Sequence, residues 1–324
     1  MNKNNINLFN KILFFGLVVL IALSTSLSFL SWMTSWLALV LGITFAIVLG
    51  NPYEGKIENI TNNLLKISIV GIGFGYPLSA ISELSTSSFS FVIIFIVLTI
   101  VIGFFIGKIF YVDRRTADMI SSGTAICGAS AIAAIASTIR ANDKQISIAL
   151  GTLFILSASG LILFPIIGNY LNLTQQQFGV WAGLAIHDTA SAIGAALDFD
   201  IAFEKDLAEK VATIIKLAKV IFIVPLVFLG AYLYKEDKKK LIFPYFIIFF
   251  LLAMFLNSKF PEFDGFSTIK VAGKKGLQIS LFLIGTNLSI KNLKVIGIKP
   301  FLHGFLLWMM VSISSLIAIL YFIK

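Results

Sequence analysis

Long runs without a charged residue are the feature that most restricts how this chain can fold. No charge occurs between Ile12 and Tyr53, between Leu84 and Gly107, or between Gln145 and His187. A helix needs about 20 mostly apolar residues to cross the hydrocarbon core of a bilayer, and each run supplies that many. Because 58% of the 324 residues are hydrophobic and only 13% are charged, an all-α, polytopic membrane protein is predicted.

Loops with charges or turn residues divide these runs into candidate helical segments. We expect a single transmembrane domain over residues 1–324, with an extra N-terminal helix in residues 1–31 and a core in residues 32–324. The first segment is interpreted as an uncleaved helix, because further spans follow at once and no small-residue cleavage site appears. The predicted segments are 12–30, 32–50, 64–81, 88–108, 119–139, 146–168, 178–197, 211–234, 241–257, 271–290 and 300–323.

The positive charges predict orientation rather than nucleic-acid binding, since they lie mainly in short loops and at span ends. The N-terminus and the loops around Lys56 and Arg114–Arg115 are basic, whereas the turns after the first and third segments are not. This asymmetry places the N-terminus in the cytoplasm. Later loops, such as Lys238–Lys240 and Lys270–Lys275, are basic on both sides, so charge leaves the topology of the second half undecided.

Two short segments resemble each other. The uncharged stretch Ile67–Ser82 and the stretch Gly276–Ile290 are both shorter than a comfortable span, and each is preceded or opened by Leu-x-Ile-Ser. Gly73 then matches Gly285 in the alignment of the two stretches. Seven predicted segments separate their positions, which gives them opposite orientations. Such a pattern is typical of transporters built from inverted repeats, although apolar sequences also match by chance.

Small residues fill the stretch "SSGTAICGASAIAAIAS", Ser121–Ser137, where large apolar side chains would be expected. Gly123 and Gly128 lower its helix propensity, and its hydroxyl groups can bond backbone groups released where a helix unwinds. A broken helix would offer N–H groups to an anion. Tight helix packing through small residues is the alternative interpretation.

Charged residues also occur deep inside predicted spans. His187 and Asp188 lie about ten residues from either end of segment 178–197, near the bilayer midplane, where an aspartate usually marks a site or a proton relay. A helical patch could join them to Ser191. The alternative is a structural charge pair that holds the helices together.

Two lysines follow in the next segment. Lys216 and Lys219 share a helix face, and Pro225 can break the helix beyond them. Either lysine could snorkel to the membrane surface. If one of them faces a cavity, the remaining positive charge favours an anionic substrate.

Other polar residues are given simpler interpretations. Lys66 is expected to snorkel, and His303 is expected at the membrane interface near the start of the last span. The single cysteine excludes an intramolecular disulfide, and no motif of a nucleophile elbow, phosphate loop or zinc helix supports an enzyme. A solvated acidic loop without calcium-loop spacing is predicted for Asp198, Asp200, Glu204 and Asp206.

Four blocks carry a resemblance to a known family. "LLKISIVGIGF", "SSGTAICGASAIAA", "AIHDTASAIGAA" and "IIKLAKVIFIVPL" resemble, in order and spacing, the YeiH-like family of proposed bacterial sulfate exporters. The resemblance covers nearly the whole chain. It implies an architecture similar to the bile-acid, arsenite and riboflavin transporter superfamily, with discontinuous helices crossing near the midplane. It also implies a small sulfur-containing or inorganic anion as cargo.

The chain departs from this family at two places. The second basic position is often arginine in the family but is Lys219 here, which loses bidentate anion recognition. The arginine that commonly follows Gly-Phe in the third helix is absent, because Gly73-Phe74 is followed by Gly75-Tyr76-Pro77.

The sequence thus predicts a secondary transporter, not an enzyme, that exports sulfate, sulfite or a small sulfonate across the bacterial inner membrane. Proton or sodium coupling is expected, without a cofactor or metal, and a homodimer is left open. A passive anion channel and an anion-binding membrane sensor are the alternatives. The predicted coupling residues are His187, Asp188 and Ser191. The predicted substrate-binding residues are Ser122, Thr124, Cys127, Gly128, Ser130, Lys216 and Lys219.

Overall fold

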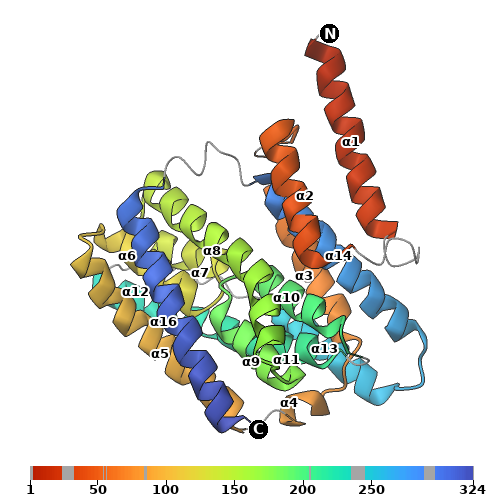
Figure 1. The fold of residues 1–324 in the computed structure, drawn as a ribbon. Coiled ribbons are helices and arrows are strands. Elements are labelled where there is room, and N and C mark those ends of the chain that lie inside the picture. The colour runs from red at the N-terminus through yellow and green to blue at the C-terminus, as the bar shows by residue number, and fades with distance from the viewer. Residues whose placement is uncertain are drawn as a thin grey trace. The chain divides into compact units, whose positions relative to one another are not determined.

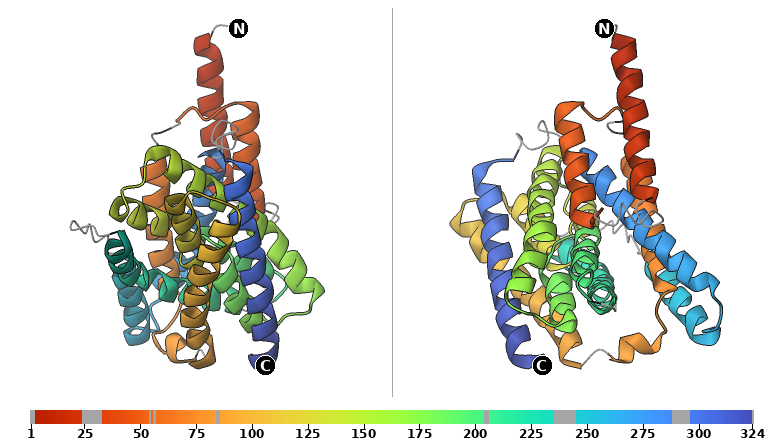
Figure 2. Two further views of the ribbon diagram at one scale, coloured as in Figure 1. Left: turned by 90° about the vertical axis from the view of Figure 1, so that its left-hand side faces the viewer. Right: turned by 45° about the vertical axis from the view of Figure 1, so that its right-hand side comes forward.

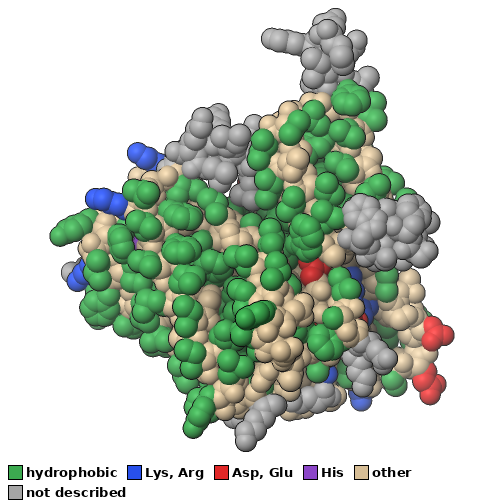
Figure 3. All heavy atoms as spheres, in the orientation of Figure 1, with side chains coloured by type: hydrophobic (Ala, Val, Ile, Leu, Met, Phe, Trp, Pro, Cys, Tyr) green, Lys and Arg blue, Asp and Glu red, His purple; other side chains and the backbone are tan. Residues whose placement is uncertain are grey.

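Helices form every element of the computed structural model, and no strand occurs among the residues that it describes (Figure 1). In the described ranges, four helical stretches are long and apolar enough to cross a membrane: Ser90–Ile109, Asp143–Tyr170, Leu207–Tyr234 and Ile298–Phe322. Hydrophobic side chains also cover most of the face shown in Figure 3. The predicted polytopic helical architecture is therefore confirmed. The structure describes residues 3–23, 33–53, 55, 57–83, 86–203, 206–234, 245–287 and 296–323.

The predicted segments coincide with helices in their described parts, but two boundaries were wrong. Segment 64–81 is not one helix, because α3 (Glu58–Gly73) ends in a turn in which Gly75 N–H bonds to the carbonyl of Ile72. Segment 271–290 was assigned too late a start, because α14 (Gly265–Asn287) begins earlier and continues through three lysines. The described part of the stretch Gly276–Ile290, which appeared short, therefore belongs to a longer helix, and Lys275 before it lies inside that helix.

The chain forms two compact units. The first unit comprises Met1–Ala80 and Tyr245–Ile290, and the second unit comprises Ile81–Pro244 and Lys291–Lys324. A short helix, α4 (Ser79–Glu83), lies at the boundary between them in the sequence. Each unit is described separately below.

Helix α14 is central to the first unit, where it packs against both α2 (Ser35–Val48) and α3. Small residues permit this approach: a Cβ atom added to Gly71 would lie 3.2 Å from the Cα atom of Gly273. The two segments that share Leu-x-Ile-Ser are therefore neighbours in space. The unit also contains α1 (Lys3–Leu23) and α13 (Phe246–Lys259).

The second unit contains the candidate site and three interrupted helices. In the paired view of Figure 2, α16 runs alongside α5. Pro225 lies in the first turn of α12, where its missing N–H group would have no helical partner, so the predicted break in segment 211–234 is confirmed at Phe222. The helices are α5 (Thr86–Ile109), α6 (Arg114–Ala125), α7 (Ala129–Thr138), α8 (Asp143–Tyr170), α9 (Gln175–Ala185), α10 (Thr189–Asp200), α11 (Leu207–Ile221), α12 (Ile223–Tyr234) and α16 (Ile298–Phe322).

Two glycines bring α9 and α11 into close contact. A Cβ atom added to Gly179 would lie 2.7 Å from the carbonyl oxygen of Ala208, and one added to Gly183 would lie 3.2 Å from that of Ala212. The glycines are four residues apart and so share one helix face, as in the small-residue motif of membrane helix pairs. This glycine face determines the short distance between α9 and α11 on which the candidate site depends.

Asp200 contradicts the predicted solvated loop. Its side chain is buried and accepts hydrogen bonds from the N–H groups of Ala208 (3.1 Å) and Glu209 (2.8 Å) and from Nε2 of Gln175 (2.5 Å). Burial raises the pKa of this carboxyl, while the same three hydrogen bonds lower it. Asp200 therefore joins the start of α9 to the start of α11. Glu204 of the same predicted loop lies outside the described residues.

Replacement of Asp200 by alanine is expected to destabilise the second unit, because two N–H groups in the first turn of α11 lose their acceptor. The loss should be about 1–2 kcal/mol, measured as a lower unfolding temperature of the purified protein. Asp200→Asn keeps one acceptor oxygen and should lose less. Equal unfolding temperatures for the native chain and Asp200→Ala would contradict this role.

Candidate helix-crossing site

Two helix interruptions meet in the second unit. The first interruption separates α6 from α7 at residues 126–128, and the second separates α9 from α10 at residues 186–188. A Cβ atom added to Gly128 would lie 3.3 Å from Cβ of Asp188 and 3.5 Å from its backbone nitrogen. The sequence predicted a broken helix in Ser121–Ser130, and the break lies within that stretch.

Glycine is required at position 128 for two reasons. Its φ of 63° with ψ of −121° is a conformation that other residues rarely adopt. An added Cβ atom would also lie 3.3 Å from the Cβ atom of Asp188, which would have to move by a few tenths of an ångström. The α6–α7 break thus depends on a glycine at the point where the two interruptions are in contact.

Asp188 begins α10 as its N-cap. Its backbone is extended, and its Oδ1 accepts a hydrogen bond of 2.8 Å from the N–H of Ser191. The hydroxyl of Ser157 on α8 accepts one of 3.2 Å from the N–H of Asp188. The predicted continuous helical patch was therefore wrong: the helix unwinds at His187, and Asp188 meets Ser191 through the cap.

Two lysines on α11 bond the end of α9. The ammonium group of Lys216 donates to the carbonyl of Ile186, and that of Lys219 donates to the carbonyl of Leu184 (2.7 Å). The last carbonyls of a helix lack intrahelical partners and carry partial negative charge, so cations stabilise them. The close α9–α11 contact allows the lysines to reach these oxygens.

The lysines do not snorkel. Their side chains are 0% and 1% exposed. Among the described residues, neither ammonium group has a carboxylate at ion-pair distance. Asp188 acts on Lys216 only through the longer-range field. The charge of the pair is thus not cancelled locally by a contacting acid.

Unpaired polar atoms adjoin the lysines. Both ring nitrogens of His187 are buried without a hydrogen-bond partner, and the hydroxyl of Thr124 on α6 is too. The His187 ring lies 6.3 Å from the Trp308 ring of α16. Cys127 is 4% exposed and lies within the field of both ammonium groups. Buried polar groups of this kind are uncommon in structural cores and are frequent at binding sites.

The predicted site residues fall into a cluster and one outlier. The cluster gathers around the two interruptions. Ser122 is the outlier, since it lines a separate pocket beside α12. Ser130 on the first turn of α7 is exposed, but its hydroxyl is hydrogen-bonded to the thiol of Cys127. The clustered residues are Thr124, Cys127, Gly128, Ser130, His187, Asp188, Ser191, Lys216 and Lys219.

His303, which was predicted at the membrane interface, is fully buried, with Nε2 3.4 Å from the hydroxyl of Ser121 on α6. Gly107 allows α5 and α6 to approach closely beside the ring, because an added Cβ atom there would lie 2.8 Å from Cβ of Ala117. Position along the sequence gave depth but not the face of α16 on which the ring lies.

Sequence reasoning missed the neighbours that shape the cluster. Gly179 and Gly183 could have been recognised by their four-residue spacing in an apolar segment. Ser157 and Trp308 carry no such signal, because nothing in the sequence relates them to His187 and Asp188.

The arrangement has the chemistry of an anion site. Helices α7 and α10 both begin where the interruptions touch, and the first intrahelical bond of α7 runs from Ile132 N–H to the carbonyl of Gly128. The preceding N–H groups of α7 therefore lack intrahelical acceptors, and helix N-termini attract negative charge. The lysines compensate the carbonyl end of α9 and add positive charge nearby. We find no group of three potential metal-ligating side chains in the described ranges.

The fold and the crossing define a polytopic helical membrane protein with two discontinuous helices that meet in one compact unit. The chain belongs to the family described as "Conserved hypothetical protein 698", whose model matches residues 10–267.

Similar proteins support this assignment. A "UPF0324 membrane protein" of Bacteroides thetaiotaomicron is 42% identical over 298 residues, covering 90% of this chain and 88% of the relative. A protein of the same description from Bdellovibrio bacteriovorus is 42% identical over 301 residues, covering 91% of each chain. No solved structure matches the chain. The relatives' names state a membrane protein, and membership of a sulfate exporter family or of the bile-acid transporter superfamily stays a prediction.

Gly128→Ala is expected to destabilise the crossing, because alanine would strain the backbone and press on Asp188. Backbone strain alone should cost about 1–2 kcal/mol, measured by thermal unfolding in detergent. Gly50→Ala is the matched control, since Gly50 also has a positive φ (76°) but nothing within 4 Å of an added Cβ atom. Equal losses in the two variants would show that the Gly128–Asp188 contact contributes nothing.

Proposed function

We propose that the protein is a secondary transporter that moves a small inorganic or sulfur-containing anion, such as sulfate, sulfite or a sulfonate, out of the cell. One observation carries the proposal: two fully buried lysines without a contacting carboxylate lie beside the meeting point of two interrupted helices. Discontinuous helices that meet inside a membrane protein are a recurrent design of transporter binding sites.

Charge favours an anion over a cation. A buried ammonium group is costly in the membrane unless a negative partner compensates it. Carbonyl oxygens compensate Lys216 and Lys219 only in part, and an ammonium group has three donors. A small oxyanion would bond to the remaining donors and to N–H groups at the start of α7 that have no intrahelical acceptor. Its binding would relieve the uncompensated charge.

Coupling is assigned to His187 and Asp188. Histidine titrates nearest to neutral pH, and both ring nitrogens of His187 are available to a proton or an anion. Proton coupling is therefore the favoured form, and a sodium ion is the alternative coupling ion. We assign no enzymatic activity and no organic cofactor.

The proposed location is the bacterial inner membrane with a cytoplasmic N-terminus. The argument for this orientation is the basic pair Arg114 and Arg115 at the start of α6, set against the uncharged turn after the first segment. A homodimer is compatible with the function but is not required by it.

Flux in reconstituted liposomes tests the proposal and the lysines together. Anions of the sulfur-containing class should accumulate against their gradient when a proton or sodium gradient is imposed, which a passive channel cannot do. Lys216→Gln and Lys219→Gln should each lower flux at least about tenfold, which corresponds to about 1.4 kcal/mol, while the amide still donates to the α9 carbonyls and preserves the fold.

Lys144→Gln is the matched control, because Lys144 is exposed at the start of α8, and its flux should equal that of the native chain. Near-normal flux in both buried-lysine variants would reduce these lysines to helix caps and remove the proposed anion site.

The pH dependence of flux tests the coupling residues. Native flux should depend on pH, and His187→Gln should abolish that dependence. Asp188→Asn should alter it as well while the asparagine still caps α10, so that the unfolding temperature stays near the native value. Unaltered pH profiles in both variants would exclude them from the proton path and would favour sodium coupling.

A further inference from the structure

A second cavity in the same unit lies apart from the helix crossing. It has a volume of about 360 Å³ and opens between α5, α6, α7 and α12. Its walls are mainly aliphatic and include Val101, Ile135 and Leu229, and Val101 is 49% exposed. An open apolar cavity beside membrane-spanning helices is suited to a hydrocarbon chain rather than to a small hydrated anion.

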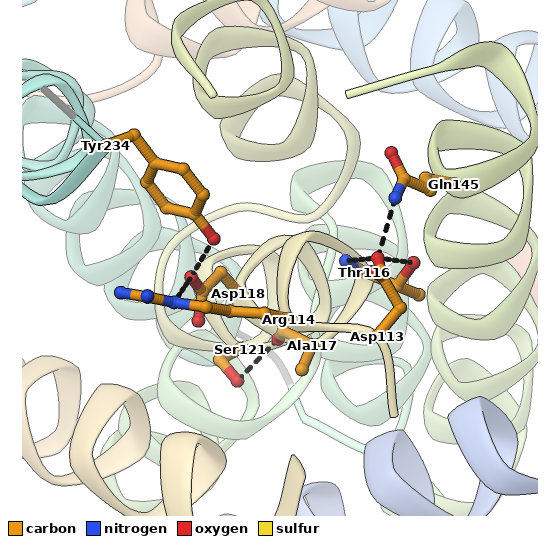
Figure 4. A network of polar contacts seen from close by, with 8 residues as sticks. All are labelled: Asp113, Arg114, Thr116, Ala117, Asp118, Ser121, Gln145 and Tyr234. Atoms are coloured by element: carbon orange, nitrogen blue, oxygen red, sulfur yellow. Dashed lines mark hydrogen bonds and ion pairs between the residues drawn. The ribbon is translucent and has the colours of Figure 1, made fainter. Parts of the chain in front are cut away.

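Polar groups gather at one end of this cavity. The hydroxyl of Tyr234 donates to Oδ2 of Asp118 (2.6 Å), and Nε of Arg114 lies 3.9 Å from the same oxygen. The guanidinium carbon of Arg114 is 5.0 Å from the centre of the Tyr234 ring. Figure 4 shows Arg114 and Tyr234 converging on Asp118. Asp118 is thus already bonded, whereas the exposed Arg114, with five N–H donors, can bind a further acceptor.

A smaller cavity of about 250 Å³ adjoins this polar end. It shares Phe104, Arg114 and Asp118 with the larger cavity, and Lys108 lines it as well. The ammonium group of Lys108 lies 4.3 Å from the centre of the Phe104 ring. Two cations therefore flank one end of an apolar cavity, at the loop between α5 and α6.

We propose that an anionic phospholipid binds here, with an acyl chain in the aliphatic cavity and its phosphate at Arg114 and Lys108. Arginine and lysine match phosphate in charge and hydrogen bonding. Both residues lie at the membrane end that the basic-loop pattern assigns to the cytoplasm, where basic pockets between spans bind anionic headgroups. A free phosphate would leave the aliphatic walls uncovered. The site requires neither transport nor the helix-crossing residues.

Native mass spectrometry of the purified protein, titrated with phosphatidylglycerol or phosphatidylethanolamine of identical acyl chains, tests the site. Phosphatidylglycerol should bind more tightly. One surface cation contributes about 1 kcal/mol, so Arg114→Gln should weaken phosphatidylglycerol binding about fivefold and should weaken binding of the zwitterionic phosphatidylethanolamine less. Lys144→Gln, which removes an exposed charge at the start of α8, should change neither.

A second variant tests the apolar part. Val101→Trp fills the cavity and should weaken both lipids, whereas Val97→Trp, on an exposed residue of α5 that lines neither cavity, should not. Equal affinity of the native chain for both lipids would overturn the proposal, as would equal effects of Arg114→Gln and Lys144→Gln. A loss in Arg114→Gln without a loss in Val101→Trp would indicate surface attraction only and would also overturn it. Each outcome is independent of whether the liposomes show anion flux.

Discussion

The second unit depends on how the backbone groups released at two helix ends are bonded inside the membrane. Hydrocarbon offers no water to these groups, so an interrupted helix has to find protein partners. Here the carbonyls at the end of α9 accept hydrogen bonds from Lys216 and Lys219, and the N–H groups at the start of α10 are capped by Asp188. The two buried charges are thus structural partners of the interruption as well as candidates for anion binding.

The architecture was largely predictable because membrane thickness fixes the length of apolar runs. The break near Gly128 was also predictable, since glycine and hydroxyl residues in an apolar segment indicate unwinding. The two lysines were singled out from the sequence, but their hydrogen-bond partners were not, because every residue has a carbonyl group and the sequence does not show which one a lysine contacts. Whether the predicted site residues bind an anion stays a prediction.

The unexpected environments of His303 and Asp200 have one physical cause. The position of a residue along the sequence does not determine which neighbouring helix its side chain faces. His303 was assigned to the interface from its position along α16, yet it is buried against α6. Asp200 was assigned to solvent from its acidic neighbours, yet it bonds the first turn of α11. In both cases a tertiary contact between helices distant in sequence decides the environment.

The order of the helices along the chain has a consequence for biosynthesis. The chain emerges from the ribosome N-terminus first, so α9 precedes α11 and its carbonyl acceptors exist before the lysines arrive. An isolated α11 would carry two charges into lipid without partners. In the presence of α9, the glycine face at Gly179 and Gly183 lets α11 approach closely enough for its lysines to bond to the α9 carbonyls. We therefore expect the stable insertion of α11 to depend on α9, which is synthesised earlier.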